Sequence, residues 1–343
     1  MKSSILIIYT GGTIGMKTDP ETGTLVPFDF SAIYQEFPSL KRLNVAIEVH
    51  TLTPVIDSSN VQPQNWITLA ELIRSKYGHY DGFVVLHGTD TMSYTASALS
   101  FMFENLAKPI VFTGSQIPIG VLRTDGRENL ITAIEIAGAK DEYGHPLVPE
   151  VSLYFQNHLF RANRTTKRSA EALSAFYSYN YPPLADVGVN IAYNRTLIHQ
   201  PDHWMEPLRV SNNFSDKVCV VKLFPGLNEQ ILSSILSIEG LQAVVLETYG
   251  AGNAPTADWF IRPLEEAIAR GLIVLNITQC KGGGVAMELY ETGLRLQQIG
   301  VTSGYDMTIE AAVTKLMYLL GSKADASEVK QALEVSLRGE LSH

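Results

Sequence analysis

Two threonine-containing segments, each directly after a short apolar run, carry the side chains best suited to chemistry. The first reads TGGTIG at residues 10–15, and the second reads HGTDT at residues 87–91. Short apolar runs closed by glycine indicate buried parallel strands. Ligands of open α/β sheets bind outside the carboxyl ends of the strands, so we expect Thr13, Thr89 and Asp90 to share one crevice. That crevice would offer hydroxyl and carboxylate chemistry.

Both segments also have purely structural explanations. The glycines at 10–15 are spaced G-G-x-x-G, whereas a dinucleotide fingerprint requires G-x-G-x-x-G. A nicotinamide-dependent oxidoreductase therefore ranks below the other functions considered for this chain. The threonines of either segment could cap a helix or satisfy backbone groups in a turn. One cap does not need the whole Gly-Thr-Asp-Thr cluster, which favours a functional role. His87 has no acid or histidine at ligand spacing, and we interpret it as structural.

Two further polar features have the same two interpretations. The segment Asp57-Ser58-Ser59 is either an ordinary turn with a helix cap or a set of hydroxyls and a carboxylate at a third strand end. Lys167 is either a solvated surface lysine or a general base in a crevice, where desolvation favours the neutral amine.

Composition excludes several classes of function. The chain has 343 residues and a net charge of -9, which gives no electrostatic footprint for nucleic acid or an anionic membrane. Cys219 and Cys280 lack metal-ligand spacing, and we expect two buried thiols in a reducing compartment. The first apolar run is too short to span a membrane and follows Met1 too closely for a signal peptide, which predicts a cytoplasmic protein. We expect no metal and no cofactor.

Strand-like and helix-like patterns alternate along the N-terminal part, which predicts a mostly parallel sheet with flanking helices. The expected strands are 5–10, 45–53, 82–87, 110–113 and 151–155, and the expected helices are 64–77, 91–106 and 129–139. Residues 178–212 change character, with prolines and polar turns that indicate an irregular region and a linker.

Alternation then resumes on a smaller scale, which predicts a flavodoxin-like parallel sheet. The expected strands are 218–223, 243–248 and 273–278, and the expected helices are 229–236, 257–270, 309–320 and 327–341. We therefore divide the chain into a catalytic α/β domain at 1–190, a linker at 191–215 and a smaller α/β domain at 216–343. Two domains suit this length, because single cores rarely grow beyond roughly 250–300 residues.

Four motifs together resemble those of bacterial L-asparaginases, and the overall pattern is similar to the cytoplasmic type I branch. They are TGGTIG at 10–15, LHGTDT at 86–91, TGSQIP at 113–118 and YGAGNAP at 249–255. The resemblance covers nearly the whole chain. It implies hydrolysis of L-asparagine to L-aspartate and ammonia, through a threonine nucleophile and an acyl-enzyme, without a cofactor. It also implies a homotetramer built as a dimer of dimers.

The resemblance also implies roles for individual residues. Thr13 would be the nucleophile, and Thr89, Asp90 and Lys167 would form a second hydrogen-bonded catalytic set. The residues implied to bind substrate are Asp57, Ser58, Ser59, Thr89, Asp90 and Asn253, of which Asn253 would reach the active site of a neighbouring subunit. The developing oxyanion needs hydrogen-bond donors, and the backbone N–H groups of the Gly88-Thr89 turn are the natural source.

Two departures from the family pattern carry predictions. Family members often have a tyrosine on the loop after the first motif, whereas residues 19–25 contain none, which leaves Thr24 as a candidate to assist Thr13. Some cytoplasmic members have an effector asparagine site, to which Thr166 and Cys280 would belong. Glu247 stands where we expect that site's arginine. A carboxylate cannot pair with the effector's α-carboxylate, so we predict no allosteric activation.

Besides the oxidoreductase mentioned above, three alternatives to the asparaginase stay open. A glutaminase would use the same residues. An amidotransferase subunit supplying ammonia to charged tRNA would be expected to show a basic surface or an extra domain, and this acidic chain shows neither. A non-catalytic asparagine or aspartate sensor would keep Asp57, Ser58 and Asp90 but would need neither Thr13 nor Lys167. The presence of all five favours the enzyme.

Overall fold

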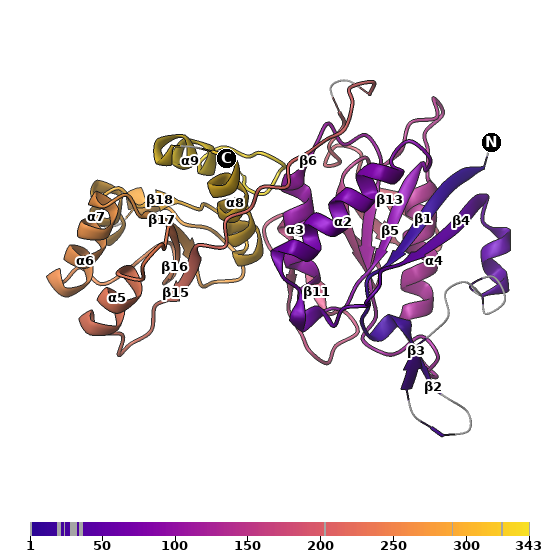
Figure 1. The fold of residues 1–343 in the computed structure, drawn as a ribbon, viewed down its shortest axis with the longest axis horizontal. Coiled ribbons are helices and arrows are strands. Elements are labelled where there is room, and N and C mark those ends of the chain that lie inside the picture. The colour runs from indigo at the N-terminus through magenta and orange to yellow at the C-terminus, as the bar shows by residue number, and fades with distance from the viewer. Residues whose placement is uncertain are drawn as a thin grey trace. The chain divides into compact units, whose positions relative to one another are not determined.

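The computed structural model describes residues 2–18, 22–23, 25–27, 33, 37–201, 204–289, 291–323 and 325–342. The chain divides into two compact units, Met1–Ser211 and Asn212–His343. Each unit has its own sheet and flanking helices (Figure 1). The predicted two-domain α/β fold is confirmed.

The first unit is built on an eight-stranded sheet in the order β13-β12-β9-β8-β7-β5-β1-β4. The parallel strands are β1 (Ser3–Tyr9), β4 (Val45–Thr51), β5 (Gly82–Leu86), β7 (Ile110–Thr113) and β8 (Val151–Phe155). The antiparallel strands are β9 (His158–Arg161), β12 (Ala185–Val187) and β13 (Ile191–Tyr193). β12 and β13 fall in the region that we expected to be irregular, and they extend the sheet beyond β9.

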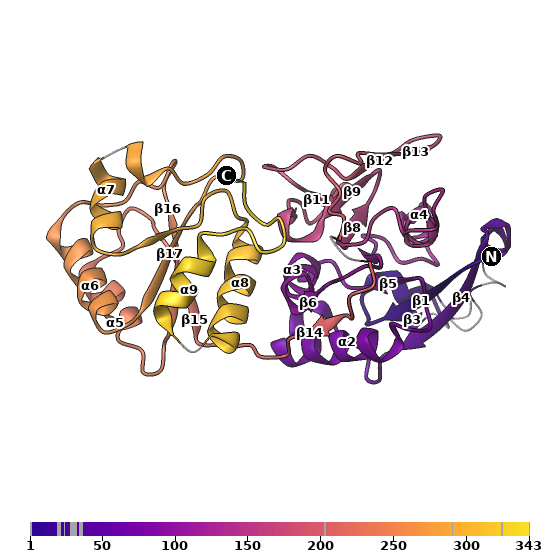
Figure 2. The same ribbon diagram turned by 90° about the horizontal axis from the view of Figure 1, so that it is seen from above.

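Among the described residues, three α-helices cover this sheet: α2 (Pro63–Lys76), α3 (Met92–Met102) and α4 (Gly126–Gly138). Figure 2 shows α2 and α4 on opposite sides of the sheet. Strands buried on both faces require apolar residues at successive positions, and every residue of β5 is buried. The described part of this unit also contains three pairs of short strands, namely β2 (Met16–Thr18) with β3 (Leu25–Pro27), β6 (Phe103–Glu104) with β14 (Arg209–Val210), and β10 (Thr166–Lys167) with β11 (Phe176–Tyr177).

The second unit contains a four-stranded parallel sheet in the order β15-β16-β17-β18. Its strands are β15 (Val218–Lys222), β16 (Ala243–Thr248), β17 (Ile273–Thr278) and β18 (Thr302–Ser303). Its helices are α5 (Glu229–Leu236), α6 (Asp258–Ala269), α7 (Glu291–Gln298), α8 (Ile309–Ser322) and α9 (Ala326–Leu333). Sequence reasoning did not predict α7 or β18.

The last helix is shorter than predicted, and the chain after it is held by a buried ion pair. α9 stops at Leu333, whereas we expected a helix to residue 341. The ammonium of Lys315 lies 2.6 Å from the Glu340 carboxylate, and both side chains are fully buried. That carboxylate also accepts backbone N–H groups of Leu337 and Arg338. Burial alone would raise the pKa of Glu340, but Lys315 and these N–H groups outweigh burial and lower it.

Two other expectations need correction. The helix predicted to reach residue 106 ends at Met102, because the next two residues form β6 and pair with β14. The predicted burial of both thiols is wrong, since Cys280 is exposed and Cys219 is partly exposed. Cys280 lies beyond the end of β17, where the chain has left the core.

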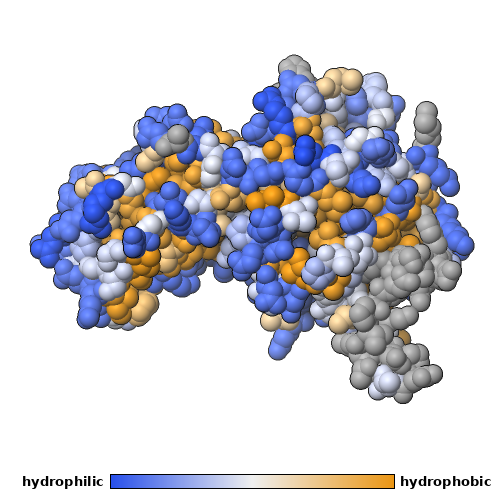
Figure 3. Space-filling model, in the orientation of Figure 1, coloured by the Kyte–Doolittle hydropathy of each residue, from blue (hydrophilic) through white to orange (hydrophobic). Residues whose placement is uncertain are grey.

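One face of the molecule carries both hydrophilic and apolar residues. On the face drawn in Figure 3, hydrophilic residues alternate with smaller apolar areas over both units. Scattered apolar residues on a surface are normal and need no partner. Within the described ranges, no helix is long and apolar enough to cross a membrane.

Candidate active site

The carboxyl ends of four neighbouring parallel strands meet at one edge of the first sheet. Tyr9 of β1 pairs with Thr51 of β4 on one side and with Leu86 of β5 on the other, and Leu86 pairs in turn with Thr113 of β7. The four strands therefore end level with one another. The polar segments that follow them leave the sheet from the same edge, as the motifs predicted.

Glycines let these segments touch directly. A Cβ on Gly12 would collide with the backbone of Gly88, and Gly12 adopts a φ of 92°, which few other residues tolerate. A Cβ on Gly88 would lie 2.5 Å from Oγ of Ser58. The segments that carry Thr13, Thr89 and Ser58 consequently pack together through bare backbone.

The backbone of Thr13 is fixed in a short helix, and its side chain is accessible. It begins a short 3-10 helix, Thr13–Gly15, in which the Gly15 amide donates to the carbonyl of Gly12 over 3.1 Å. Ile14 is buried in the core, whereas Thr13 is exposed. A substrate can therefore approach the Thr13 hydroxyl, as the Gly-Gly pair before it suggested.

Lys167, Thr89 and Asp90 form one hydrogen-bonded group. The Lys167 ammonium donates to Thr89 Oγ1 over 2.8 Å and to Asp90 Oδ1 over 2.7 Å. Lys167 lies in β10, opposite Phe176 of β11, and its side chain is 21% exposed, against 62% for Asp90. Lys167 is thus a partly buried lysine with two specific acceptors, unlike a freely solvated surface lysine.

Gln116 also belongs to this group, although sequence reasoning gave it no role. The Thr89 hydroxyl donates to Oε1 of Gln116 over 3.2 Å. Gln116 follows β7, which lies beside β5 in the sheet. The TGSQIP motif was the available signal, but only the strand order shows that it ends next to Thr89.

Asp57 forms the helix cap that one interpretation of its segment predicted. Its side chain caps the 3-10 helix Ser58–Asn60, since Oδ1 accepts the backbone N–H and the hydroxyl of Ser59, each over 3.0 Å. These two hydrogen bonds lower the pKa of Asp57. Ser58 is buried against Gly88, and its carbonyl accepts the Thr91 hydroxyl over 2.7 Å. The Asp57 carboxylate remains ionised and exposed, and it can attract an ammonium group.

His87 has the surroundings of a core residue. It is buried, its ring centroid lies 6.2 Å from that of Phe112, and Nδ1 is 2.7 Å from the carbonyl oxygen of Gly88. Burial lowers the pKa of His87 to about 4, so the ring is neutral at pH 7. Among the described residues, no group of three or more His, Cys, Asp or Glu side chains could hold a metal ion.

The remaining predicted site residues are accounted for within their own units. Asn253 follows β16, and its Oδ1 accepts the Thr292 hydroxyl over 2.7 Å. The Glu247 carboxylate lies 3.9 Å from the ammonium of Lys222. Thr166 is buried in β10. Thr24 lies outside the described residues.

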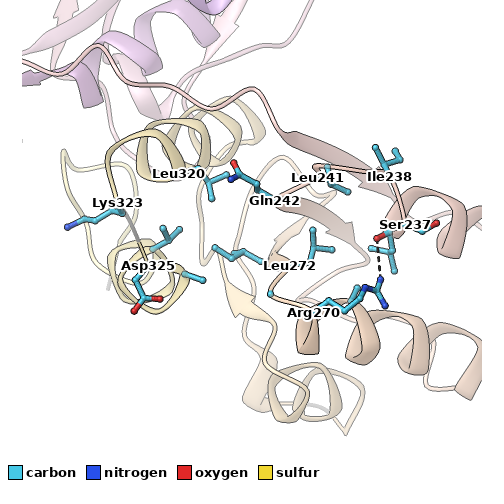
Figure 4. A pocket seen from close by; sticks show the side chains of 15 residues that line it. Ser237, Ile238, Leu241, Gln242, Arg270, Leu272, Leu320, Lys323 and Asp325 are labelled. Carbon is cyan, nitrogen blue, oxygen red and sulfur yellow. Dashed lines mark hydrogen bonds between the residues drawn. The ribbon is translucent and has the colours of Figure 1, made fainter.

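A pocket of about 620 Å³ lies in the second unit, at the end of the sheet where β16 and β17 begin (Figure 4). Leu272 is buried at its inner side, while Arg270, Lys323 and Asp325 are exposed around it. This is the opposite end of the strands from their carboxyl ends. None of the predicted site residues lines this pocket.

The comparisons with known proteins agree with this fold. The family model "Asparaginase, N-terminal" matches residues 4–199, and the model "Glutaminase/Asparaginase C-terminal domain" matches residues 217–333. Together they place the chain among the two-domain α/β amidohydrolases of the glutaminase and asparaginase class. The chain belongs to the asparaginase family.

Full-length relatives support the same assignment. L-asparaginase 1 of Escherichia coli K12 is 43% identical over 342 residues, which cover 99% of this chain and 98% of that protein. The crystal structure of L-asparaginase I from Vibrio cholerae superposes with a TM-score of 0.89 at 40% identity, covering 100% of both chains. The thermostable L-asparaginase from Thermococcus kodakarensis gives a TM-score of 0.88 at 32% identity, covering 99% of both chains.

Proposed function

We propose that this chain hydrolyses L-asparagine to L-aspartate and ammonia, with Thr13 as the nucleophile. The observation that carries the proposal is the Lys167–Thr89–Asp90 group beside the Gly12–Gly88 contact, because that contact brings the segment of the accessible Thr13 against the segment of Thr89. A nucleophile with a base nearby is the arrangement used in covalent catalysis, of which acyl transfer is one form. The names of the full-length relatives support the choice of substrate.

The substrate would be held by its α-substituents. The ionised Asp57 carboxylate suits the α-ammonium group, and the Ser58 hydroxyl suits the α-carboxylate. The Ser59 hydroxyl, which donates to Asp57 in the structure, would turn its proton to the α-carboxylate when substrate binds. Thr89 and Asp90 complete the binding set from the neighbouring strand end. Fixing both α-substituents would aim the side-chain amide toward Thr13, which supplies the entropic part of catalysis.

The reaction would proceed in two acyl-transfer steps. Thr13 Oγ1 forms a bond to the side-chain amide carbon of asparagine. Backbone N–H groups of the Gly88-Thr89 turn donate hydrogen bonds to the negatively charged oxygen that results. The C–N bond then breaks, and the nitrogen leaves as ammonia with the proton lost by Thr13. Water hydrolyses the resulting ester, which releases L-aspartate and restores the Thr13 hydroxyl. Asparagine and water are the only reactants, and side chains of this chain would supply both the nucleophile and the proton carrier.

Lys167 would be the proton carrier of this site. In the structure its ammonium donates to both Thr89 and Asp90, so it must lose a proton before it can act as a base. We assign Asp90 the role of orienting Lys167, and Lys167, in contact with Thr89, that of carrying the proton during the reaction.

We further propose the assembly that the resemblance implies, a homotetramer made as a dimer of dimers in the cytoplasm. Asn253 would contribute to the active site of a neighbouring subunit. Light scattering against concentration, read beside turnover, tests this assembly. Full activity of a monomer would contradict it.

The test of the function is ammonia release from L-asparagine over a concentration series, with L-glutamine in parallel. Thr13→Ala should remove turnover, whereas Thr68→Ala, an exposed threonine on α2, should leave it unchanged. Preference for glutamine would replace the asparaginase by a glutaminase. Asparagine binding without ammonia release would support the sensor instead.

A further inference from the structure

The side-chain amide of Gln116 is engaged at both ends. Its Nε2 donates to the backbone carbonyls of Ala170 and Ala172, over 3.1 and 3.3 Å. Its Oε1 accepts the hydroxyl of Thr89 over 3.2 Å. Gln116 therefore connects a predicted catalytic residue to the turn between β10 and β11.

These partners allow only one direction for each hydrogen bond. Carbonyl oxygens can only accept, so the amide nitrogen must face Ala170 and Ala172, and Oε1 must face Thr89. The single proton of Thr89 is consequently directed to Gln116. The lone pairs of Thr89 are left to receive the ammonium of Lys167. The chain of donors runs one way, from Lys167 through Thr89 to Gln116.

The turn that Gln116 holds begins directly after Lys167. Arg168 fastens the same turn, because its guanidinium donates to the carbonyl and to the hydroxyl of Ser174. Gln116 itself is firmly mounted, since its backbone N–H donates to the buried carboxylate of Asp125 over 3.0 Å. A rigid strand end thus sets the spacing between Lys167 and Thr89.

We propose that Gln116 is a positioning residue of this site, which fixes the proton direction of Thr89 and its separation from Lys167. The inference rests on the proposed function. Gln116 acts through Thr89, so its loss should slow the chemical step and leave the groups that hold the α-substituents in place. A purely structural glutamine would instead affect the stability of the fold without separating kcat from KM.

The test compares Gln116→Met with the wild-type chain for L-asparagine turnover. Methionine keeps the length of the side chain and removes every hydrogen bond that the side chain of Gln116 makes. We expect kcat to fall by about 10- to 100-fold, as for a small misplacement of reacting groups, while KM stays within about twofold. Ser115→Ala is the matched control, because this neighbouring buried hydroxyl has no hydrogen-bond partner among the described residues. It should keep wild-type kcat and KM.

Thermal unfolding shows whether each variant is folded. If Gln116→Met does not fold, Gln116→Glu serves, because it keeps an acceptor for Thr89, loses the donors to Ala170 and Ala172, and adds a negative charge that those two carbonyls repel. A lower kcat at unchanged KM is expected for it too. Wild-type kcat in either folded variant, beside an active wild-type chain, would overturn the role of Gln116 alone. No ammonia from the wild-type chain would overturn the proposed function first.

Discussion

Replacing Lys167 by methionine should separate catalysis from stability. Lys167 holds Thr89 and Asp90 at 2.8 and 2.7 Å, and methionine has nearly the same length without the charge. Removing a positioned acid–base group typically costs about 10²- to 10⁴-fold in rate. At about 1.36 kcal/mol for each factor of ten, this loss corresponds to about 3–5 kcal/mol of transition-state stabilisation.

The same substitution should cost the fold little. Asp90 is 62% exposed, so water replaces its partner, and an exposed ion pair contributes only about 0–1 kcal/mol. Lys140→Met is the matched control, because Lys140 pairs with Asp81 over 2.9 Å, and Asp81 directly precedes β5, at the opposite end of that strand from Thr89. Continuous measurement of ammonia gives the rate, and urea unfolding gives the free energy. Turnover of folded Lys167→Met within a few-fold of the Lys140 control would refute the base assignment.

Three other predictions concern stability and regulation. Glu340→Gln leaves the Lys315 ammonium buried without its counter-charge, so urea unfolding should show a loss of about 3–5 kcal/mol. The depressed pKa of His87, about 4 against 6.5, stabilises the fold above pH 6.5, and this contribution is lost as the pH falls toward 4. It amounts to about 3 kcal/mol at 1.36 kcal/mol per pKa unit, and unfolding curves of His87→Gln should lack that part of the pH dependence. With Glu247 at the expected effector position, asparagine saturation should be hyperbolic; a sigmoidal rate curve would show that an effector site works despite it.

The elements that could be predicted from sequence are those determined by local pattern. The strands at 110–113, 151–155 and 243–248 have the predicted bounds, because strands buried on both faces need unbroken apolar runs. The short antiparallel strands β12 and β13 were missed, because three-residue strands at the edge of a sheet leave no such run. Antiparallel edge strands are recognised by their pairing, which sequence pattern alone does not show.

Features that depend on distant contacts could not be predicted in the same way. The end of α9 depends on the Lys315–Glu340 pair, whose partners are far apart along the chain. The approach of Lys167 to Thr89 was predicted only from the family resemblance, since the two residues are separated by 78 positions. Gln116 belongs to the TGSQIP motif, but its contact with Thr89 was not predicted, because that contact depends on the order of the strands.

The backbone contact between Gly12 and Gly88 has a consequence for mutational tolerance. A side chain at Gly12 meets main-chain atoms of Gly88, and main-chain atoms cannot be made smaller by a second substitution. Gly12 therefore lacks a compensating partner, unlike neighbours in a side-chain core, where one residue can shrink as another grows. A side chain at Gly88 would instead meet the side chain of Ser58. In a saturation library selected for activity, position 12 should stay glycine whatever changes elsewhere.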